Sequence, residues 1–213
     1  MACRHRRRAR PAVVPGTRAA TAIRTLVREA PEPVGGDRDD AGMTWTAPNI
    51  TRMDEPISGG EREQLEAWLD YHRQTLLLKC AGLTVDQLRE RAVPPSTLSL
   101  LGLVRHMAEV ERGWFRIRFA GEGLTSYWIT DDNQDAEFDD VDTADPQEAF
   151  DAFEEEVTRA RAAAAGRSLD DTFLHRGTTF TLRWVYLHMI EEYARHNGHA
   201  DLLRERIDGA TGD

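Results

Sequence analysis

Apolar side chains recur at intervals of three and four residues along four segments of the chain, which is the spacing of one face of an α-helix. In the first segment the repeating positions are Leu65, Trp68, Leu69, Leu76 and Leu77. The preceding sequence Ser58-Gly-Gly-Glu61 has the form of a capping box, in which a serine and a glutamate side chain bind free N–H groups at a helix start. The pattern therefore predicts a helix that begins at Ser58 and stops at Gly82.

The second segment predicts a longer helix, over about 97–120. Its apolar stripe consists of Leu100, Leu103, Met107, Val110, Trp114 and Ile117. At about 100° per residue, these positions fall within one half of the helical wheel. His106 lies in the middle of the stripe, whereas Arg105, Arg112 and Arg116 lie on the opposite face.

Two further helices are expected in the second half of the chain. Asp145 is a suitable N-cap, a proline follows it at the first helical position, and Glu148 completes the capping box. This third helix is expected to end near Gly166. The last helix spans about 182–207, and Gly209 is its expected stop.

The connections between these helices contain little regular structure. Residues 84–95, TVDQLRERAVPP, predict a short helical turn that two prolines end, and residues 166–181 predict a connector or a short hairpin. No alternating apolar pattern is long enough to build a sheet. The sequence therefore predicts an all-α four-helix bundle.

An acidic segment precedes the third helix and resembles a calcium-binding loop only in part. Asp131, Asn133 and Asp135 occupy the first, third and fifth positions of such a loop. The sixth position is Ala136 where glycine is needed, and the twelfth is Asp142 where glutamate is expected. We therefore expect a solvated acidic loop, which folds over a site as its rim. Two aromatic residues upstream of it, Tyr127 and Trp128, either line a pocket or pack the end of the bundle.

Charge is distributed unevenly along the chain. The first 28 residues contain eight arginines and no acid; because the whole chain has a net charge of −10 and these arginines contribute +8, the remainder carries −18. We expect residues 1–42 to be a disordered Arg-rich N-terminal extension, or a segment upstream of a protein that begins at Met43, and residues 43–213 to form the domain. An acidic domain is not expected to bind nucleic acid, which needs clustered Lys and Arg.

Cysteine usage and hydropathy indicate a cytoplasmic protein that does not enter the membrane. The two cysteines, Cys3 and Cys80, form neither a disulfide framework nor a CxxC site. Cys80 lies on a helix, where a free cysteine usually packs as a small apolar side chain. No apolar run approaches the roughly 20 residues that span a bilayer.

The last predicted helix concentrates groups that bind metal ions. On the helical wheel His188, Glu192, His196 and His199 lie within about 80° of one another, on the same side as Val185 and Leu203, which indicates an inward face. Glu191 points elsewhere and is expected to be solvated. A lone buried carboxylate costs several kcal/mol, and a divalent cation would compensate it, since carboxylate and neutral imidazole are its natural ligands.

His106 is the expected third ligand, together with Glu192 and His196, which are adjacent at i and i+4. Other interpretations remain for each residue alone: His106 as a core histidine, and the Glu192–His196 pair as an intrahelical contact. His188 is either a ligand or a residue that lines the site. His199 is either a fourth ligand or a hydrogen-bond partner of one.

At these residues the chain resembles the DinB/YfiT-like superfamily of four-helix metal-binding proteins. The matching stretches are LLGLVRHMAEVERGWF (100–115) and LRWVYLHMIEEYARHNGHADLLRERIDG (182–209), and the similarity covers roughly residues 43–212. The second stretch is also similar to an actinobacterial branch that includes the mini-circle proteins. In the superfamily, one histidine from the second helix and two residues four apart on the last helix bind the metal, which implies His106, Glu192 and His196 here.

The resemblance also implies a metal and a chemistry. Many members have histidine at the position of Glu192; a glutamate there is similar to the mycothiol-dependent maleylpyruvate isomerases and favours zinc, with nickel, iron and manganese as alternatives. The usual pattern has glutamine near His199, so the role of His199 stays open. A metal-bound low-molecular-weight thiol, such as mycothiol or bacillithiol, would attack an electrophilic small molecule in a transfer or isomerisation. Arg195 is a candidate to hold polar groups of the thiol.

Other functions are compatible with the same ligands. Three protein ligands and a water would make a zinc hydrolase. Two histidines and one carboxylate also describe the facial triad of iron oxygenases, although that triad is normally built in another fold. The bundle would otherwise bind a metal and a ligand without catalysis. A homodimer along one face of the bundle is also compatible with the sequence.

Overall fold

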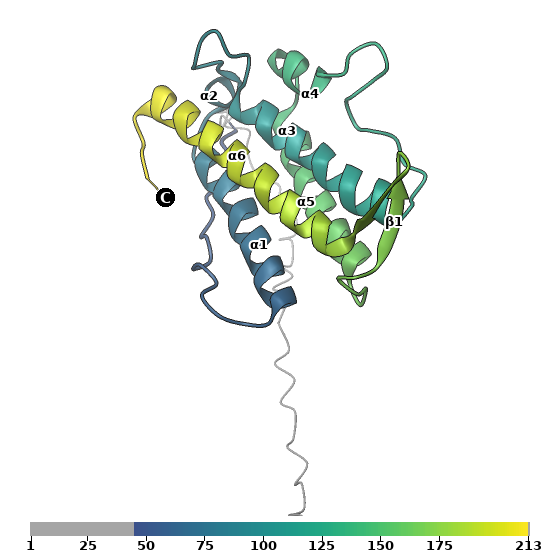
Figure 1. Ribbon diagram of the computed structural model, residues 1–213. Helices are drawn as coiled ribbons and strands as arrows, with labels where there is room; N and C mark the ends of the chain where they lie inside the picture. The colour runs from purple at the N-terminus through teal and green to yellow at the C-terminus, as the bar shows by residue number, and fades with distance from the viewer. Residues whose placement is uncertain (1–44, 213) are drawn as a thin grey trace, which may run out of the picture. The chain divides into compact units, whose positions relative to one another are not determined.

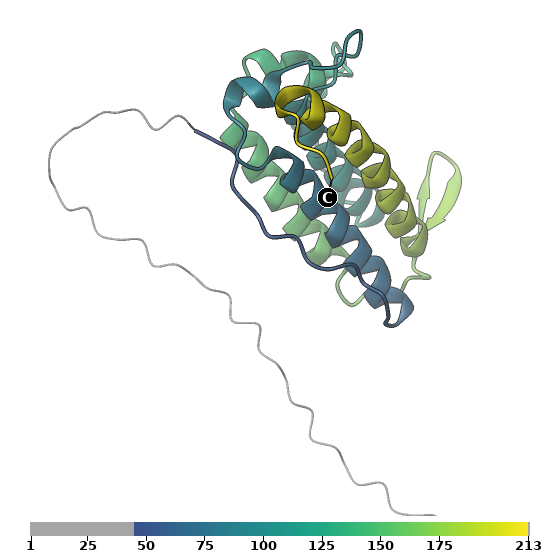
Figure 2. The same cartoon turned by 90° about the vertical axis from the view of Figure 1, so that its left-hand side faces the viewer.

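The computed structural model describes residues 45–212. The predictions for residues 1–42 lie outside this range. Within it the chain forms a bundle of four long helical segments with a small hairpin at one end (Figure 1). The first long helix packs mainly against the last and the second against the third, and the view turned by 90° shows the same pairing (Figure 2). The predicted all-α four-helix bundle is confirmed.

The helices and strands follow the predicted order. The long elements are α1 (Glu61–Cys80), α3 (Leu100–Glu111) with the π-helical segment η1 (Arg112–Phe119), α5 (Pro146–Ala164) and α6 (Leu182–Asp208). The short ones are α2 (Val85–Arg89), α4 (Ala136–Asp139), the 3₁₀ turn η2 (Asp140–Asp142) and the antiparallel strands β1 (Thr172–His175) and β2 (Thr178–Thr181). Gly209 follows α6 with a φ of +79°, a conformation that glycine adopts without a steric penalty.

The start of α1 differs from the prediction by two residues. Its N-cap is Gly60, and the carboxylate of Glu63 accepts the Gly60 N–H at 2.9 Å. The predicted box with Ser58 and Glu61 is therefore wrong. Glu61 instead forms an ion pair with Arg183 at the start of α6, at 2.6 Å.

The second long helix is not α-helical throughout. The side chain of Ser99 caps α3 by accepting the N–H of Gly102 at 3.1 Å. Beyond Glu111 the helix widens into η1, and the N–H of Ala120 donates to the carbonyl of Phe115, five residues back. A continuous α-helix to residue 120 was therefore a wrong prediction. Single turns of π-helix inside helices frequently occur at functional sites.

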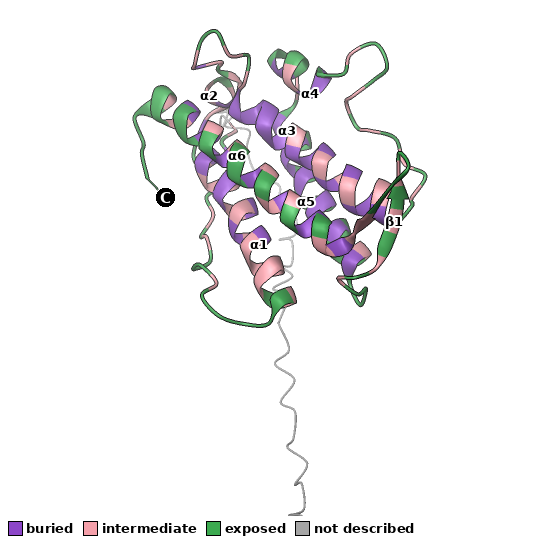
Figure 3. Cartoon of the chain, viewed as in Figure 1, coloured by how far each residue is buried: buried purple, intermediate pink, exposed green. Residues whose placement is uncertain are grey.

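The core lies between the four long segments and is almost completely closed to solvent (Figure 3). Each long segment contributes at least one large side chain that is at most 1% exposed. They include Leu69 and Leu76 of α1, Met107 of α3, Phe115 of η1, Phe153 of α5, and Met189 and Tyr193 of α6. Burial of such side chains contributes roughly 1.5–3 kcal/mol each, which is the main force that holds the bundle together.

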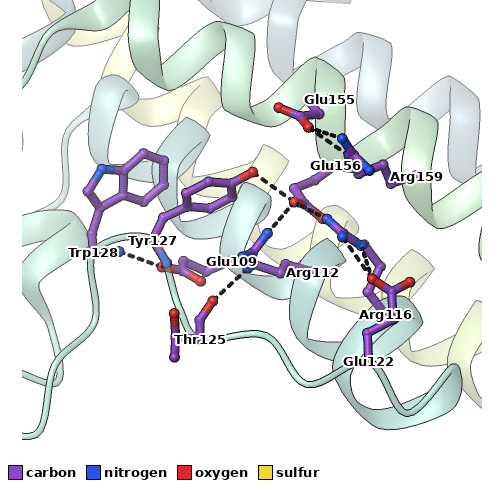
Figure 4. A network of polar contacts seen from close by, with 10 residues as sticks. All are labelled: Glu109, Arg112, Arg116, Glu122, Thr125, Tyr127, Trp128, Glu155, Glu156 and Arg159. Carbon is purple, nitrogen blue, oxygen red and sulfur yellow. Dashed lines mark hydrogen bonds and ion pairs between the residues drawn. The ribbon is translucent and has the colours of Figure 1, made fainter.

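The predicted arginine-rich face of the second helix is buried as well. Arg112 and Arg116 each donate from Nη1 to the carboxylate of Glu156 on α5, at 2.7 Å (Figure 4). The Tyr127 hydroxyl donates to the same oxygen at 2.8 Å. Glu156 is fully buried, and these three donors compensate the cost of removing its charge from water.

The segment after η1 is held against the bundle by a second carboxylate. Glu109 accepts the backbone N–H groups of Tyr127 at 2.6 Å and of Trp128 at 2.8 Å (Figure 4). Arg112 lies over the Tyr127 ring and Arg105 over the Trp128 ring, with guanidinium-to-centroid distances of 4.2 and 4.7 Å. Both aromatic residues therefore pack against the bundle, and Tyr127 also lines a surface hollow beside α5.

Candidate metal centre

The three predicted ligands lie together although His106 is far from the other two in the sequence. His106 of α3, Glu192 and His196 each offer one ligand atom within 4.8 Å of the others. The rings of His106 and His196 meet edge to face, with centroids 4.8 Å apart. His196 Nε2 lies 3.4 Å from Glu192 Oε2. Two atoms bound to one tetrahedral zinc at about 2.05 Å would be roughly 3.3 Å apart, so this spacing fits a shared cation.

The site lies at the rim of the core and not within it, contrary to the inward face expected from the wheel. The side chains of His106, Glu192 and His196 are 23%, 19% and 13% exposed. The fully buried face of α6 is formed by other residues, among them Met189 and Tyr193. Partial exposure leaves a path for a substrate to reach the three ligand atoms.

Glu137 is a candidate site residue that the sequence analysis missed. It belongs to the acidic segment that was expected to be a solvated loop, but it is 2% exposed, and its Oε1 lies 3.1 Å from Nδ1 of His106. With Nδ1–H donated to this carboxylate, Nε2 of His106 keeps a free lone pair. Metal-binding histidines usually have such a carboxylate behind them. Its second oxygen is buried without a hydrogen-bond partner.

Apolar contacts bring Glu137 to this position. Its neighbour Phe138 packs on the His106 ring, with centroids 5.1 Å apart. Gly102 on α3 leaves room for Phe138, because a Cβ there would lie 2.8 Å from Phe138 Cδ1. Ala136 and Val141 are buried beside it. Three apolar residues at 136, 138 and 141 within an acidic run were the signal that this segment packs onto the bundle.

The two uncertain histidines occupy different sides of the three ligands. His188 Nε2 lies 3.4 Å from Glu192 Oε1, and its ring stacks on Trp184 at 4.6 Å. The Glu192 carboxylate is therefore between two imidazoles. Nδ1 of His199 lies 3.4 Å from Nδ1 of His196, on the ring nitrogen that faces away from Glu192. This arrangement favours a hydrogen-bonding role for His199.

The electrostatic environment keeps His196 in the form that binds metals. Burial lowers the pKa of His196 to about 4, and the neighbouring His106, His199 and Arg195 contribute in the same direction. The imidazole is therefore neutral at pH 7, with its lone pair available. Arg195 itself pairs with Glu191 on the exposed face of α6, which matches the predicted solvation of Glu191.

A cavity of about 490 Å³ opens beside His106 and extends along η1 to the hairpin. Its lining includes Glu109, Val110, Trp114, Ile117, Arg118, Ile129, Leu174 and His175. The walls combine apolar and aromatic side chains with polar and charged ones in similar proportion. A volume of this size accommodates a small organic substrate.

Cys80 does not belong to the site. It is fully buried in the core, and burial raises the pKa of its thiol to about 12. In a Cys3→Ser background, we expect no reaction of the native protein with Ellman's reagent at pH 8 within minutes, and one equivalent of thiol after unfolding in guanidinium. Only about one molecule in 10⁴ would carry the thiolate at that pH. Rapid labelling of the native protein would contradict the predicted burial.

A protein-family model described as Mycothiol-S-transferase matches residues 64–209, which include most of α1, all of α6 and all three candidate ligands. The chain belongs to the mycothiol-S-transferase family. This confirms the resemblance to the DinB/YfiT-like superfamily and the expected thiol-dependent chemistry, and membership of the family implies a transferase. The similarity to the mini-circle branch stays a prediction. The comparisons with curated proteins and with solved structures gave no match.

Among residues 45–212 no helix is both long and apolar enough to cross a membrane.

Proposed function

We propose that the protein is a divalent-metal-dependent mycothiol S-transferase in which His106, Glu192 and His196 hold the cation, with zinc as the metal. The observation that carries this proposal is the convergence of the three side chains from two helices, with a buried carboxylate behind His106. The donor set of two imidazoles and one carboxylate is typical of catalytic zinc sites that keep a position open.

When bound, the metal would lower the pKa of a coordinated thiol, so that the sulfur is a thiolate at neutral pH. Glu137 holds the His106 proton at Nδ1 and so directs Nε2 toward the site. His188 Nε2 lies 3.4 Å from Glu192 Oε1, and its Nδ1 lies 3.8 Å from the exposed Glu191 carboxylate, so neither nitrogen is free toward the site. The thiol proton therefore passes to solvent, which reaches the partly exposed ligands. The cavity beside His106 holds the electrophile.

The transfer step is a substitution at the electrophile. The mycothiol sulfur donates an electron pair to the electrophilic carbon and forms the C–S bond. The bond from that carbon to the leaving group breaks, and the leaving group departs with its electron pair.

The test is turnover of a chromogenic electrophile with a panel of thiols. We expect multiple turnovers with mycothiol and none without a thiol, with bacillithiol and glutathione included for comparison. Turnover that does not depend on any thiol would overturn the proposal in favour of a hydrolase. Tight metal binding without turnover on any thiol would overturn it in favour of a metal-stabilised ligand-binding bundle.

Glu137→Gln is expected to lower metal affinity by about 10- to 100-fold, the usual effect of removing the carboxylate behind a metal-binding histidine. An amide oxygen still accepts the hydrogen bond but does not increase the basicity of the imidazole as a carboxylate does. The measurement is metal retention during titration with a chelator.

Asp139→Asn is the matched control for Glu137→Gln. It makes the same change of charge on the same short helix, at an exposed position. Equal metal affinities of the two variants would show that Glu137 does not support His106.

A further inference from the structure

Arg118 is a cation without a counter-ion in the wall of the cavity. Among residues 45–212 no carboxylate forms an ion pair with it, whereas Arg112 and Arg116 on the same segment both bind Glu156. Its guanidinium lies over the Trp114 ring, 4.6 Å from the centroid. Its Nε is buried and has no hydrogen-bond partner. An anion that entered the cavity would compensate this charge.

The backbone makes room for the guanidinium beside the cavity. A Cβ at Gly113 would collide with the end of the Arg118 side chain, so glycine permits this rotamer. The guanidinium therefore lies next to residues 113 and 114, about seven residues along the helix from His106. At about 1.5 Å per residue this is roughly 10 Å, which is the length of a small aromatic molecule. His106 and Arg118 line the same cavity.

Other groups around this end of the cavity strengthen the preference for an anion. Burial lowers the pKa of His175, and the positive charges of Arg118 and Arg176 lower it further. Glu109 is the acidic residue in the lining, and its Oε1 is already bound by the N–H groups of Tyr127 and Trp128. Among the described residues no ion pair joins Glu109 to Arg118, so the guanidinium stays available to an anion that enters the cavity.

We propose that the electrophile carries a carboxylate at the end remote from its reacting carbon, and that Arg118 binds this carboxylate while Trp114 and the apolar walls hold the body of the molecule. This inference rests on the proposed transferase function and names its substrate class: aromatic or apolar acids of about 10 Å that bear a leaving group.

A kinetic test compares 4-(chloromethyl)benzoate with 4-(chloromethyl)benzamide, which share the reacting carbon and the chloride leaving group. With mycothiol, we expect wild-type kcat/KM to be at least about tenfold higher for the acid, in the usual range for a hydrogen bond to a charged group. Arg118→Gln should remove this preference for the acid, while its kcat/KM for the amide should stay within about threefold of the wild-type value. Arg176→Gln is the matched control, since it removes one exposed positive charge nearby.

Two results would overturn the inference. One is an equal loss of kcat/KM for the acid and the amide in Arg118→Gln, which would indicate that Arg118 has a structural role only. The other is the same loss of preference in Arg176→Gln, which would indicate a long-range effect of net charge. Absence of thiol-dependent turnover with every electrophile would instead overturn the proposed function.

A binding measurement separates the two proposals. Isothermal titration of the purified, metal-loaded protein with 4-methylbenzoate and 4-methylbenzamide needs no turnover. We expect the carboxylate to bind more tightly than the amide, and Arg118→Gln to weaken carboxylate binding by at least about tenfold. If Arg118→Gln bound 4-methylbenzoate as tightly as the wild type, the carboxylate would be held at another place, such as the metal. This result would overturn the inference.

Discussion

His196→Ala is expected to leave the purified protein with little bound metal, where the unmodified protein holds about one equivalent. The substitution removes one of two adjacent ligands on α6, and Glu192 and His106 alone cannot complete the set of three that a catalytic site uses. Because even the residues behind the ligands usually contribute 10- to 100-fold, transferase activity should fall by at least about 100-fold. Elemental analysis of protein prepared without a metal-binding tag gives the metal content.

The control for this prediction is another histidine of the same cavity. His175→Ala removes an imidazole that lines the cavity but lies outside the group of three ligands, and it should keep about one equivalent of metal. Far-UV circular dichroism should show that both variants are folded. Full metal content in His196→Ala would refute the assignment of His196 as a ligand. His199→Ala is the third variant of this series. It is expected to keep the metal, because His199 contacts the ring of His196 and is not one of the three proposed ligands.

Glu111→Ala is expected to lower the free energy of unfolding by about 3–5 kcal/mol. Glu111 is fully buried, and it accepts hydrogen bonds from Arg73 Nε and Nη2, both at 2.7 Å, and from the Tyr193 hydroxyl at 2.8 Å. Among the described residues, the substitution leaves the buried Arg73 guanidinium with the carboxylate of Asp70 as its remaining counter-ion. Urea denaturation measures the change through the midpoint and the slope.

An exposed ion pair on α5 provides the control for the buried pair of Glu111 and Arg73. Glu155→Ala breaks the Glu155–Arg159 pair on the surface of α5, where both side chains are about half exposed, and should change stability by less than about 1 kcal/mol. A double variant, Arg73→Met with Glu111→Leu, should recover much of the loss, since no charge stays buried alone. Equal stabilities of Glu111→Ala and Glu155→Ala would contradict this account of the core.

The predictions that succeeded were those that depend on local periodicity. The i and i+4 spacing of Glu192 and His196 places both on one side of a helix, and the apolar stripe around His106 indicates a face that packs against other helices. These two facts were sufficient to predict that the three side chains meet. The helix ends were less certain, because two glycines and several polar residues before Glu61 offer competing caps, and Gly60 is the one used.

Besides the start of α1, the predictions that failed concern the segments after Glu111, where contacts between distant parts of the chain decide the structure. Glu137 lies in an acidic run whose composition favours exposure, but Phe138 packs on His106 and carries Glu137 into the bundle. Arg112 and Arg116 face a carboxylate 40 or more residues away, on α5. The π-helical turns of η1 occur in the segment that carries both arginines. None of these partners can be read from spacing within one helix.

The amino-acid sequence by itself predicted the four long helical segments and placed three candidate metal ligands on two of them, because side-chain spacing within one helix decides which residues share a face. Only the tertiary structure decided which carboxylate contacts His106, that the site lies at the rim of the core, and that Arg118 lines the cavity with no ion-pair partner among residues 45–212. These features depend on how segments pack across the bundle, and burial and pairing of charges are properties of that packing.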